Sequence, residues 1–289
     1  MTSLSAAGRP GIPVHDDGGA AFQRTAPPRV VDGCRISTFD STVHAQGAWR
    51  DDELHMAPVS GLVTAEILAH APRPELRLAR LSFEILGLLH YGPLTVSTQT
   101  IRPGRTIELI ESTVEAQGRS VLIARAWRLL TGDTSEVSAT RDPGLTPLAE
   151  CHSYPDMAQS WPGGFIRSLD IRVADDHRPG DGRCWITSEV EMIAGEPTAD
   201  LVRLIGMVDT ANGVAAFLPT GPGGYTFPNV DLQIHLYREP VGRWLGLATS
   251  SHLGTDGIGL TSTVLHDESG PFGHAEQLQT VRRVPVSDA

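Results

Sequence analysis

The chain has 289 residues, 40% of them apolar and 20% charged, which suits one large domain or two small ones with a sizeable core. Its formal charge is −11 and all 23 basic residues are Arg. An acidic chain without basic clusters argues against broad nucleic-acid binding, and the lack of an 18-residue apolar run predicts no membrane span.

The N-terminal 33 residues are rich in Gly, Pro and Ala, and we predict that they form a mobile tail. They contain no continuous apolar segment, so they do not resemble a secretion signal. The three cysteines, Cys34, Cys151 and Cys184, are far apart and have no metal-binding spacing. Together these features predict a cytoplasmic protein with reduced thiols and no bound metal.

The first half begins with a helical pattern over residues 58–71, P-V-S-G-L-V-T-A-E-I-L-A-H-A. Val59, Leu62, Val63 and Ile67 share one stripe, and Pro58 suits the first turn of a helix. Four runs rich in β-branched residues follow and predict consecutive antiparallel strands, with turns at Pro103-Gly104 and Gln117-Gly118. These runs are residues 76–86, 94–101, 105–116 and 119–130.

The second half repeats this order of elements. An amphipathic helix is expected within residues 198–213, T-A-D-L-V-R-L-I-G-M-V-D-T-A-N-G, with Leu201, Leu204, Ile205 and Val208 on its buried stripe. Strand-like runs lie before and after that helix. They are residues 165–174, 183–193, 226–237, 243–251, 257–266 and 273–282.

The repeated order predicts an α+β fold in which each half folds a curved antiparallel sheet around one long helix. We place the N-terminal unit at residues 34–131, a polar crossover linker at 132–162 and the C-terminal unit at 163–289. The two units are expected to pack as an internal pseudo-dimer. An all-β barrel with an incidental helix is the alternative, which is less favoured because helices occupy matching places in both halves.

Asp209 is an unusual residue in the second helix, because it lies four positions after Ile205 and so falls on the apolar stripe. A buried carboxylate is costly unless it is paired, hydrogen-bonded or used in chemistry. A structural explanation is a cap or an ion pair with Arg203 or an Arg of the other half. The functional explanation is a general base, with the polar residues Asn229 and Gln277 on nearby strands as its partners.

Several stretches together resemble the double-hotdog acyl-CoA thioesterases over about residues 35–285. They are A-P-V-S-G-L-V-T-A-E-I-L, I-R-P-G-R-T-I-E-L-I-E, N-V-D-L-Q-I-H-L-Y-R-E-P, D-G-I-G-L-T-S-T-V-L-H and Q-L-Q-T-V-R-R. The resemblance implies a tandem hotdog fold and hydrolysis of an acyl-CoA by an activated water. It implies no metal or redox cofactor, and an acyl-CoA as the molecule bound.

In that family an Asp on the second helix, a Thr before the third strand and a Gln on the last strand hold the attacking water. The resemblance assigns the Asp to Asp209 and the Gln to Gln277. Asn229 stands at the Thr position, which is a departure, because an amide replaces the hydroxyl.

Aligning the repeats places Arg80 at the position of Asn229 and Arg125 at that of Gln277, so the first half is expected to be catalytically silent. Arg80 or Arg125 is a candidate for binding the coenzyme A phosphates, and ion pairs at the joint between the halves are the alternative. Exposed sheet edges predict that these units assemble further into a homo-oligomer.

Two other functions remain open from the sequence. One is a hotdog hydratase or dehydratase acting on acyl thioesters. Hydratases of that kind with a helix Asp carry a His five residues later, where this chain has Val214. The other is a non-catalytic module that binds acyl-CoA or an acyl chain, which the Asn229 departure keeps open.

Overall fold

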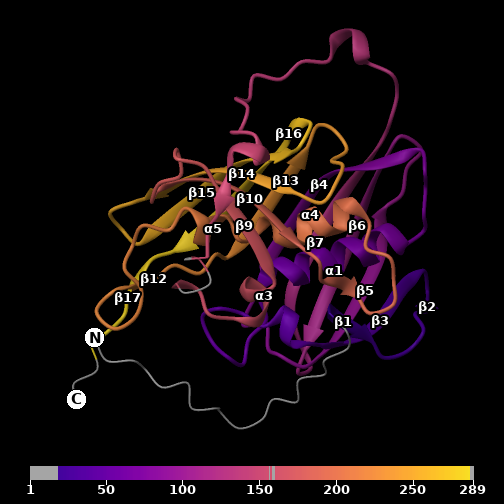
Figure 1. Cartoon of the computed structure of the whole chain (residues 1–289). Helices are drawn as coiled ribbons and strands as arrows, with labels where there is room; N and C mark the ends of the chain where they lie inside the picture. The colour runs from indigo at the N-terminus through magenta and orange to yellow at the C-terminus, as the bar shows by residue number, and fades with distance from the viewer. Residues whose placement is uncertain (1–18, 156, 158–159, 287–289) are drawn as a thin grey trace.

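The computed structural model describes residues 19–155, 157 and 160–286. Within these residues the chain forms a 15-stranded sheet with few helices, which confirms the α+β class (Figure 1). The helices are α1 (Met56–Ala69), α3 (Gly164–Arg167), α4 (Asp200–Val208) and α5 (Ala211–Val214), with 3-10 turns at Val43–Ala45, Ser135–Val137 and Leu148–Glu150. None of the described helices is long and apolar enough to cross a bilayer.

The strands expected from the sequence are present in order along the chain, and three further strands precede α1. Those of the first half are β1 (Ala20–Arg24), β2 (Arg29–Val31), β3 (Cys34–Ser41), β4 (Leu76–Ile85), β5 (Pro93–Arg102), β6 (Ile107–Ala116) and β7 (Arg119–Leu130). The later strands are β8 (His152–Ser153), β9 (Leu169–Val173), β10 (Asp181–Ser188), β11 (Glu191–Ile193), β12 (Tyr225–Thr226), β13 (Asp231–Leu236), β14 (Leu245–Leu253), β15 (Ile258–Asp267), β16 (Gly270–Thr280) and β17 (Arg282–Arg283).

One continuous sheet replaces the two curved sheets expected from the sequence, and it is not strongly curled. Its order is β11-β1-β3-β5-β6-β7-β4-β13-β16-β15-β14-β10-β9-β8, while β2 pairs with β3 and β12 pairs with β17 separately. The halves join where β4 and β13 pair antiparallel, with Leu81 opposite Ile234 and Arg80 opposite His235. Each of these strands would otherwise leave a row of unpaired backbone groups at the edge of its half, and pairing satisfies both rows.

The helices α1 and α4 pack against each other in front of this sheet (Figure 1). A Cβ added to Gly61 would lie 3.0 Å from the Cα of Gly206, so both glycines permit a close helix crossing. The hydroxyl of Ser60 donates to the carbonyl of Ile205 at 3.0 Å across the same contact. The helix α1 is buried on nearly every side, which is typical of a core helix.

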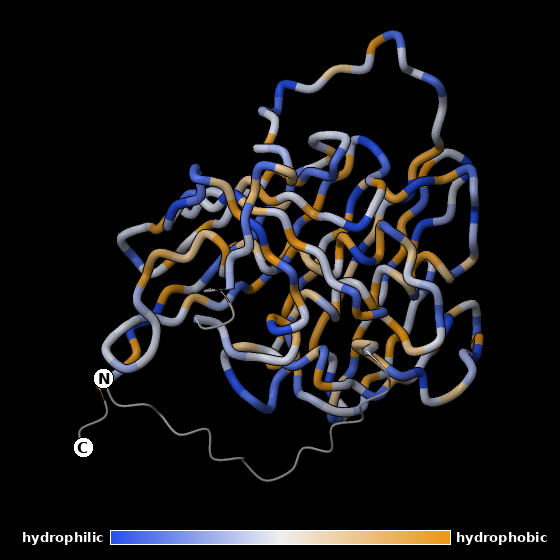
Figure 2. Tube along the Cα trace, viewed as in Figure 1, coloured by the Kyte–Doolittle hydropathy of each residue, from blue (hydrophilic) through white to orange (hydrophobic). Residues whose placement is uncertain are grey.

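Hydrophobic residues recur along the helices and strands in the middle of the molecule, whereas the projecting crossover after β7 is mostly hydrophilic (Figure 2). The later part of this crossover contacts the second half. Asp142 accepts from Tyr237 at 3.0 Å and contacts His274 at the same distance. The crossover thus projects from the molecule after β7 and then packs against the second half through Asp142.

The expectations for the N-terminal tail and for residues 165–174 were wrong. Part of the predicted N-terminal tail forms β1 and β2, and the buried Phe22 explains why, because β1 pairs with both β3 and β11; residues 1–18 of that tail lie outside the described residues. Residues 165–174 were expected to be a strand, but the first of them belong to α3 and the strand β9 begins at Leu169.

Candidate active site

Asp209 lies at the C-terminal end of α4, as its C-cap, and is 4% exposed. The helix expected over residues 198–213 is divided at this point, because α4 ends at Val208 and α5 starts at Ala211. The amphipathic pattern correctly placed this acid on the buried side. Within the described residues, no hydrogen bond or ion pair joins it to Arg203, which instead donates to the carbonyls of Ser188 and Val190.

Asn229 reaches Asp209 because of an irregularity in the pairing of β13 with β16. Continuing the register of Gln233 with Glu276 would bring Val230 opposite Gln279, but Asn229 forms that bridge instead. One extra residue in a strand shifts the following side chains to the opposite face. Asn229 is therefore turned toward the helix, although it shares sequence parity with the outward-facing Asp231.

Gln277 lies on β16 and is 1% exposed, on the face of the sheet that carries the core. Its Nε2 donates to Oδ1 of Asp209 at 2.9 Å, and Nδ2 of Asn229 donates to the same oxygen at 2.8 Å. The structure thus brings together the three residues that the sequence predicted. Oε1 of Gln277 is buried and has no hydrogen-bond partner in the described part of the chain.

The other carboxyl oxygen of Asp209 faces a residue of the first half. Oδ2 lies 3.4 Å from Nδ1 of His55, which is the N-cap of α1. The same Nδ1 accepts from the backbone N–H of Ala57 at 3.1 Å, so the ring presents an unprotonated nitrogen at this point. The candidate site therefore lies between the C-terminal end of α4 and the N-terminal end of α1.

Burial shifts both groups toward their neutral forms. It raises the pKa of Asp209 to about 7, against the opposing hydrogen bonds from Asn229 and Gln277. Burial alone lowers the pKa of His55 to about 4. Near pH 7 the contact thus joins a neutral imidazole to a carboxyl group that is about half protonated, and it is not an ion pair. A carboxyl group with such a pKa can accept a proton at neutral pH.

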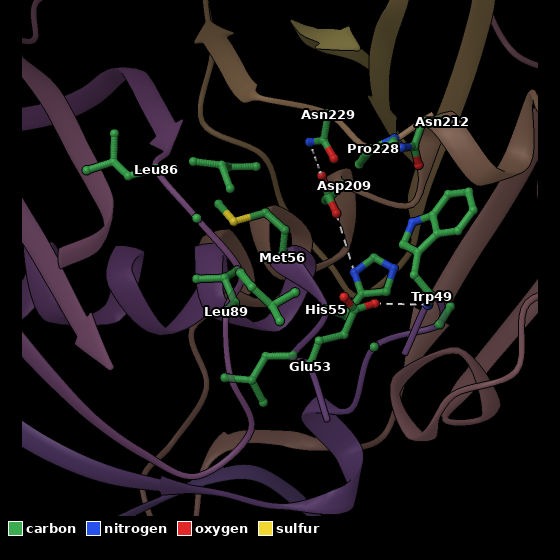
Figure 3. Close-up of a pocket in the computed structure, with 16 residues that line it drawn as sticks. Trp49, Glu53, His55, Met56, Leu86, Leu89, Asp209, Asn212, Pro228 and Asn229 are labelled. Carbon is green, nitrogen blue, oxygen red and sulfur yellow. Dashed lines mark hydrogen bonds and ion pairs between the residues drawn. The ribbon is translucent and has the colours of Figure 1, made fainter. Parts of the chain in front are cut away.

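A pocket of about 340 Å³ opens beside these residues (Figure 3). Asp209 and Asn229 lie between its two sides, one lined by Met56, Leu86 and Leu89 and the other by Trp49 and Asn212 (Figure 3). Apolar walls with a few convergent polar groups are typical of small-molecule sites.

Much of the lining comes from the first half and was missed by the sequence analysis, including the polar and aromatic residues Trp49, Glu53 and His55. Glu53 is 8% exposed and accepts the backbone N–H groups of Trp49 and Arg50. Burial raises the pKa of its carboxyl group. The sequence carried one signal, since His55 directly precedes the helix and a polar residue there is a candidate N-cap. Nothing local showed that this cap meets the other half.

Arg80 and Arg125 do not line the pocket. Arg80 donates to Oε1 of Gln233 at 3.3 Å, and Arg125 forms a 2.8 Å ion pair with Glu111, its side chain 55% exposed. Neither of these interactions involves Asp209, and the ion pair of Arg125 with Glu111 lies within the first half.

The predicted repeat alignment of these two arginines was wrong by one or two residues. Adding one constant to the residue numbers of the first half converts its strand pairs into those of the second half. The pair Ile110 with Ala126 thus corresponds to Thr261 with Gln277. The same offset matches Leu78 with Arg128 to Asn229 with Gln279. Ala126 and Leu78 therefore stand where the second half has its two amides.

The helices complete this comparison between halves. They meet at Gly61 and Gly206, and three residues beyond each glycine lie Thr64 and Asp209. The hydroxyl of Thr64 donates to the carbonyl of Ser60. The first half thus lacks an acid and both amides at the matching place. This absence supports the prediction that the first half is catalytically silent, although the prediction was first based on Arg80 and Arg125.

Comparison with known proteins identifies the family. Residues 45–129 match the acyl-CoA thioesterase N-terminal domain, and residues 148–281 match the acyl-CoA thioesterase C-terminal domain. The chain belongs to the acyl-CoA thioesterase family. The resemblance seen in the sequence is therefore confirmed. No curated protein is similar enough to match.

Several solved structures have a fold similar to that of this thioesterase-family chain. A hotdog-fold protein of Alicyclobacillus acidocaldarius has a TM-score of 0.69 at 12% identity, covering 90% of this chain and 97% of its own. An acyl-CoA thioesterase II of Mycobacterium marinum has a TM-score of 0.61 at 14% identity, covering 91% and 97%. The dehydratase domain of PpsC from Mycobacterium tuberculosis has a TM-score of 0.52 at 12% identity, covering 93% and 100%. At such identities these matches establish the hotdog fold alone.

Proposed function

We propose that this member of the family hydrolyses an acyl-CoA thioester to a free acid and coenzyme A, with Asp209 as the general base. The observation that carries the proposal is the environment of its carboxyl group. Two amide donors hold Oδ1, which leaves Oδ2 available in a buried site beside a 340 Å³ pocket. A carboxyl group with a pKa of about 7 is suited to take a proton from water at neutral pH.

The proposed step needs no covalent intermediate. Asp209 takes one proton from a water molecule while the oxygen of that water attacks the thioester carbonyl. The unpartnered Oε1 of Gln277 accepts a hydrogen bond from the remaining O–H group, which stays on the attacking oxygen. The tetrahedral intermediate then expels the coenzyme A sulfur, which takes up the proton held by Asp209. Because His55 and Met56 line the pocket at the start of α1, the positive end of this helix favours the oxyanion.

Asp209→Asn tests the proposal. It removes the proton acceptor and is nearly the same shape, so thiol release from acyl-CoAs should fall by at least about a hundredfold. The matched control is Asp170→Asn on β9, which changes a carboxylate that pairs with Arg172 and lies 44% exposed. Equal turnover by Asp209→Asn and the control would remove Asp209 from the mechanism.

A second candidate function rests on the contact between His55 and Asp209. The sequence argued against a hydratase because Val214 stands where a His was expected, yet His55 of the first half supplies an imidazole 3.4 Å from Asp209. A neutral imidazole beside a carboxyl group that is about half protonated near pH 7 can add water to a 2-enoyl thioester or remove it from a 3-hydroxyacyl thioester. Loss of enoyl ultraviolet absorbance on mixing with a 2-enoyl-CoA, without thiol release, would favour this function.

Several finer points belong to the same proposal. The division into two hotdog units at residues 34–131 and 163–289, a cytoplasmic location and a homo-oligomer are part of it, as is acyl-CoA as the molecule bound. Arg80 and Arg125 remain predicted ligands of the coenzyme A phosphates. An unchanged affinity of Arg80→Ala for an acyl-CoA would end that role for Arg80, and sedimentation of the purified chain would measure its assembly.

A further inference from the structure

Three aromatic side chains from separate segments meet at one side of the pocket, where Trp49 lines it and the other two lie behind Trp49. Trp49 precedes α1, Trp161 precedes α3 and Phe227 precedes β13. Their ring centroids lie 4.9 Å apart for Trp49 and Trp161, 5.3 Å for Trp49 and Phe227, and 5.7 Å for Trp161 and Phe227, all nearly edge to face. We refer to these three residues as the aromatic wall. Such contacts are favourable and hold each ring in a defined orientation.

The aromatic wall separates the pocket from two smaller cavities. One cavity, of about 20 Å³, is lined by Trp49 and Trp161, and the other, of about 10 Å³, by Phe227 and Leu218. Asn212 lines both of them and the 340 Å³ pocket as well. The three spaces therefore converge on one residue beside Asp209, and the rings fill the volume between them.

The two ends of the pocket differ in exposure. Leu86 is 53% exposed on one side; on the other side Trp49, which lines the pocket, is 38% exposed, and Trp161 and Phe227 behind it are 9% and 4% exposed. The charged part of coenzyme A must remain hydrated, so in the bound substrate it extends into solvent on the side of Leu86. With the thioester carbonyl at Asp209, the apolar acyl group then points toward the aromatic wall.

We propose that the aromatic wall ends the acyl site and restricts the substrate to short acyl groups. This inference rests on the proposed function and names its substrate class. Small-molecule pockets span about 300 to 1,000 Å³, and this one is at the lower end although it must also admit the end of the coenzyme arm. We therefore expect few methylenes of the acyl group to fit between Asp209 and the rings.

Trp161→Ala tests the inference, because it removes a ring that borders the cavity of about 20 Å³ behind Trp49. The wild type should have a higher kcat/KM for butanoyl-CoA than for dodecanoyl-CoA. The variant should shift that ratio toward dodecanoyl-CoA by at least about tenfold, since each methylene that gains a buried place favours binding about fourfold. Trp161→Phe, a smaller truncation, should give a smaller shift in the same direction and covers the case in which Trp161→Ala does not fold.

The matched control is Trp244→Ala, since Trp244 stacks with Arg172 and borders none of these three cavities. It should leave the ratio unchanged. Binding of the non-hydrolysable thioethers butyl-CoA and dodecyl-CoA gives a second measurement that needs no turnover. A wild-type preference for dodecanoyl-CoA, or an unchanged preference in folded Trp161 variants, would overturn the inference. Altered thioether selectivity without any hydrolysis would instead uphold the aromatic wall and contradict the proposed function.

Discussion

At the scale of single residues, the site depends on how the two oxygens of Asp209 are used. Oδ1 receives both amides, and Oδ2 faces an imidazole nitrogen that already accepts a hydrogen bond. Two acceptors facing each other at 3.4 Å favour a proton between them, which agrees with the raised pKa of this buried acid. The Asn at position 229 keeps the donor role toward Asp209 that the site requires.

The rate of hydrolysis should depend on pH through Asp209. In the proposed mechanism the deprotonated form acts as base, and burial raises the pKa of Asp209 to about 7. We therefore expect kcat/KM to rise as pH increases through about 7 and to level off above it. Measurement of kcat/KM from pH 5 to 9 checks this. A rate that stays constant between pH 5 and 8 would mean that another group limits the reaction.

Stability should respond to the same carboxyl group in the opposite sense. Because its folded pKa lies above the unfolded value of about 3.9, the folded state holds more protons, and stability falls as pH rises from about 4 to about 7. Asp209→Asn removes this cost, and its side-chain N–H group can donate to Nδ1 of His55. The variant should be more stable than wild type by a margin of a few kcal/mol at pH 8, and by less at pH 4.5. Thermal unfolding at the two pH values would show a constant margin if this is wrong.

At the scale of elements, most of the architecture could be predicted because its signals are local. The period of the helix stripe placed Asp209 on the buried side, and the β-branched runs located β4 to β7 within a few residues. The extra residue before β13 has no local signature, so the orientation of Asn229 could not be derived. The same bulge recurs at the equivalent place of the first half, between Leu78 and Arg80.

The helix α1 ends on a buried arginine, and this contact is open to test. Arg128 is 3% exposed and donates to the carbonyls of Ile67, His70 and Ala71, while Glu108 lies 3.2 Å from it. Arg128→Met would leave these carbonyls and a buried carboxylate without their main partner. We expect a loss of about 3 to 5 kcal/mol in the free energy of unfolding, measured in urea.

The control for that experiment is Arg125→Met on the same strand. Its guanidinium is 55% exposed and has one ion pair, so we expect a loss below about 1 kcal/mol. Adding Glu108→Gln to Arg128→Met should recover part of the stability, because the stranded charge disappears. Similar losses for the two arginine variants would show that the helix end does not depend on Arg128.

At the scale of the whole molecule, the halves are joined by far more than the crossover. The pairs β4 with β13 and β1 with β11 extend the sheet across the joint, and α1 packs on α4 beside it. His55 and Asp209 come from different halves, so the candidate site exists only when both are in place. Such long-range pairings leave no mark within one segment, which is why neither the single sheet nor His55 was predicted.

Cleavage of the crossover should therefore leave the protein assembled. Residues 129–141 are all exposed, so a protease recognition sequence inserted after Gly132 is accessible. We expect the two cleaved pieces to elute together in gel filtration and to keep their thioester hydrolysis within about twofold. Separation of the pieces, or loss of activity on cutting, would show that the covalent link is needed to hold the halves in register.

The matching strand pairs of the two halves lie in one chain, which affects how the halves can evolve and how many active sites each chain has. In a dimer of identical subunits, every substitution appears twice, so an alanine could not replace an active glutamine in only one copy. Here Ala126 and Gln277 occupy equivalent places and differ. Substitutions can therefore accumulate in one half without changing the proposed catalytic residues of the other half. A tight-binding inhibitor of the proposed active site should bind one equivalent per chain.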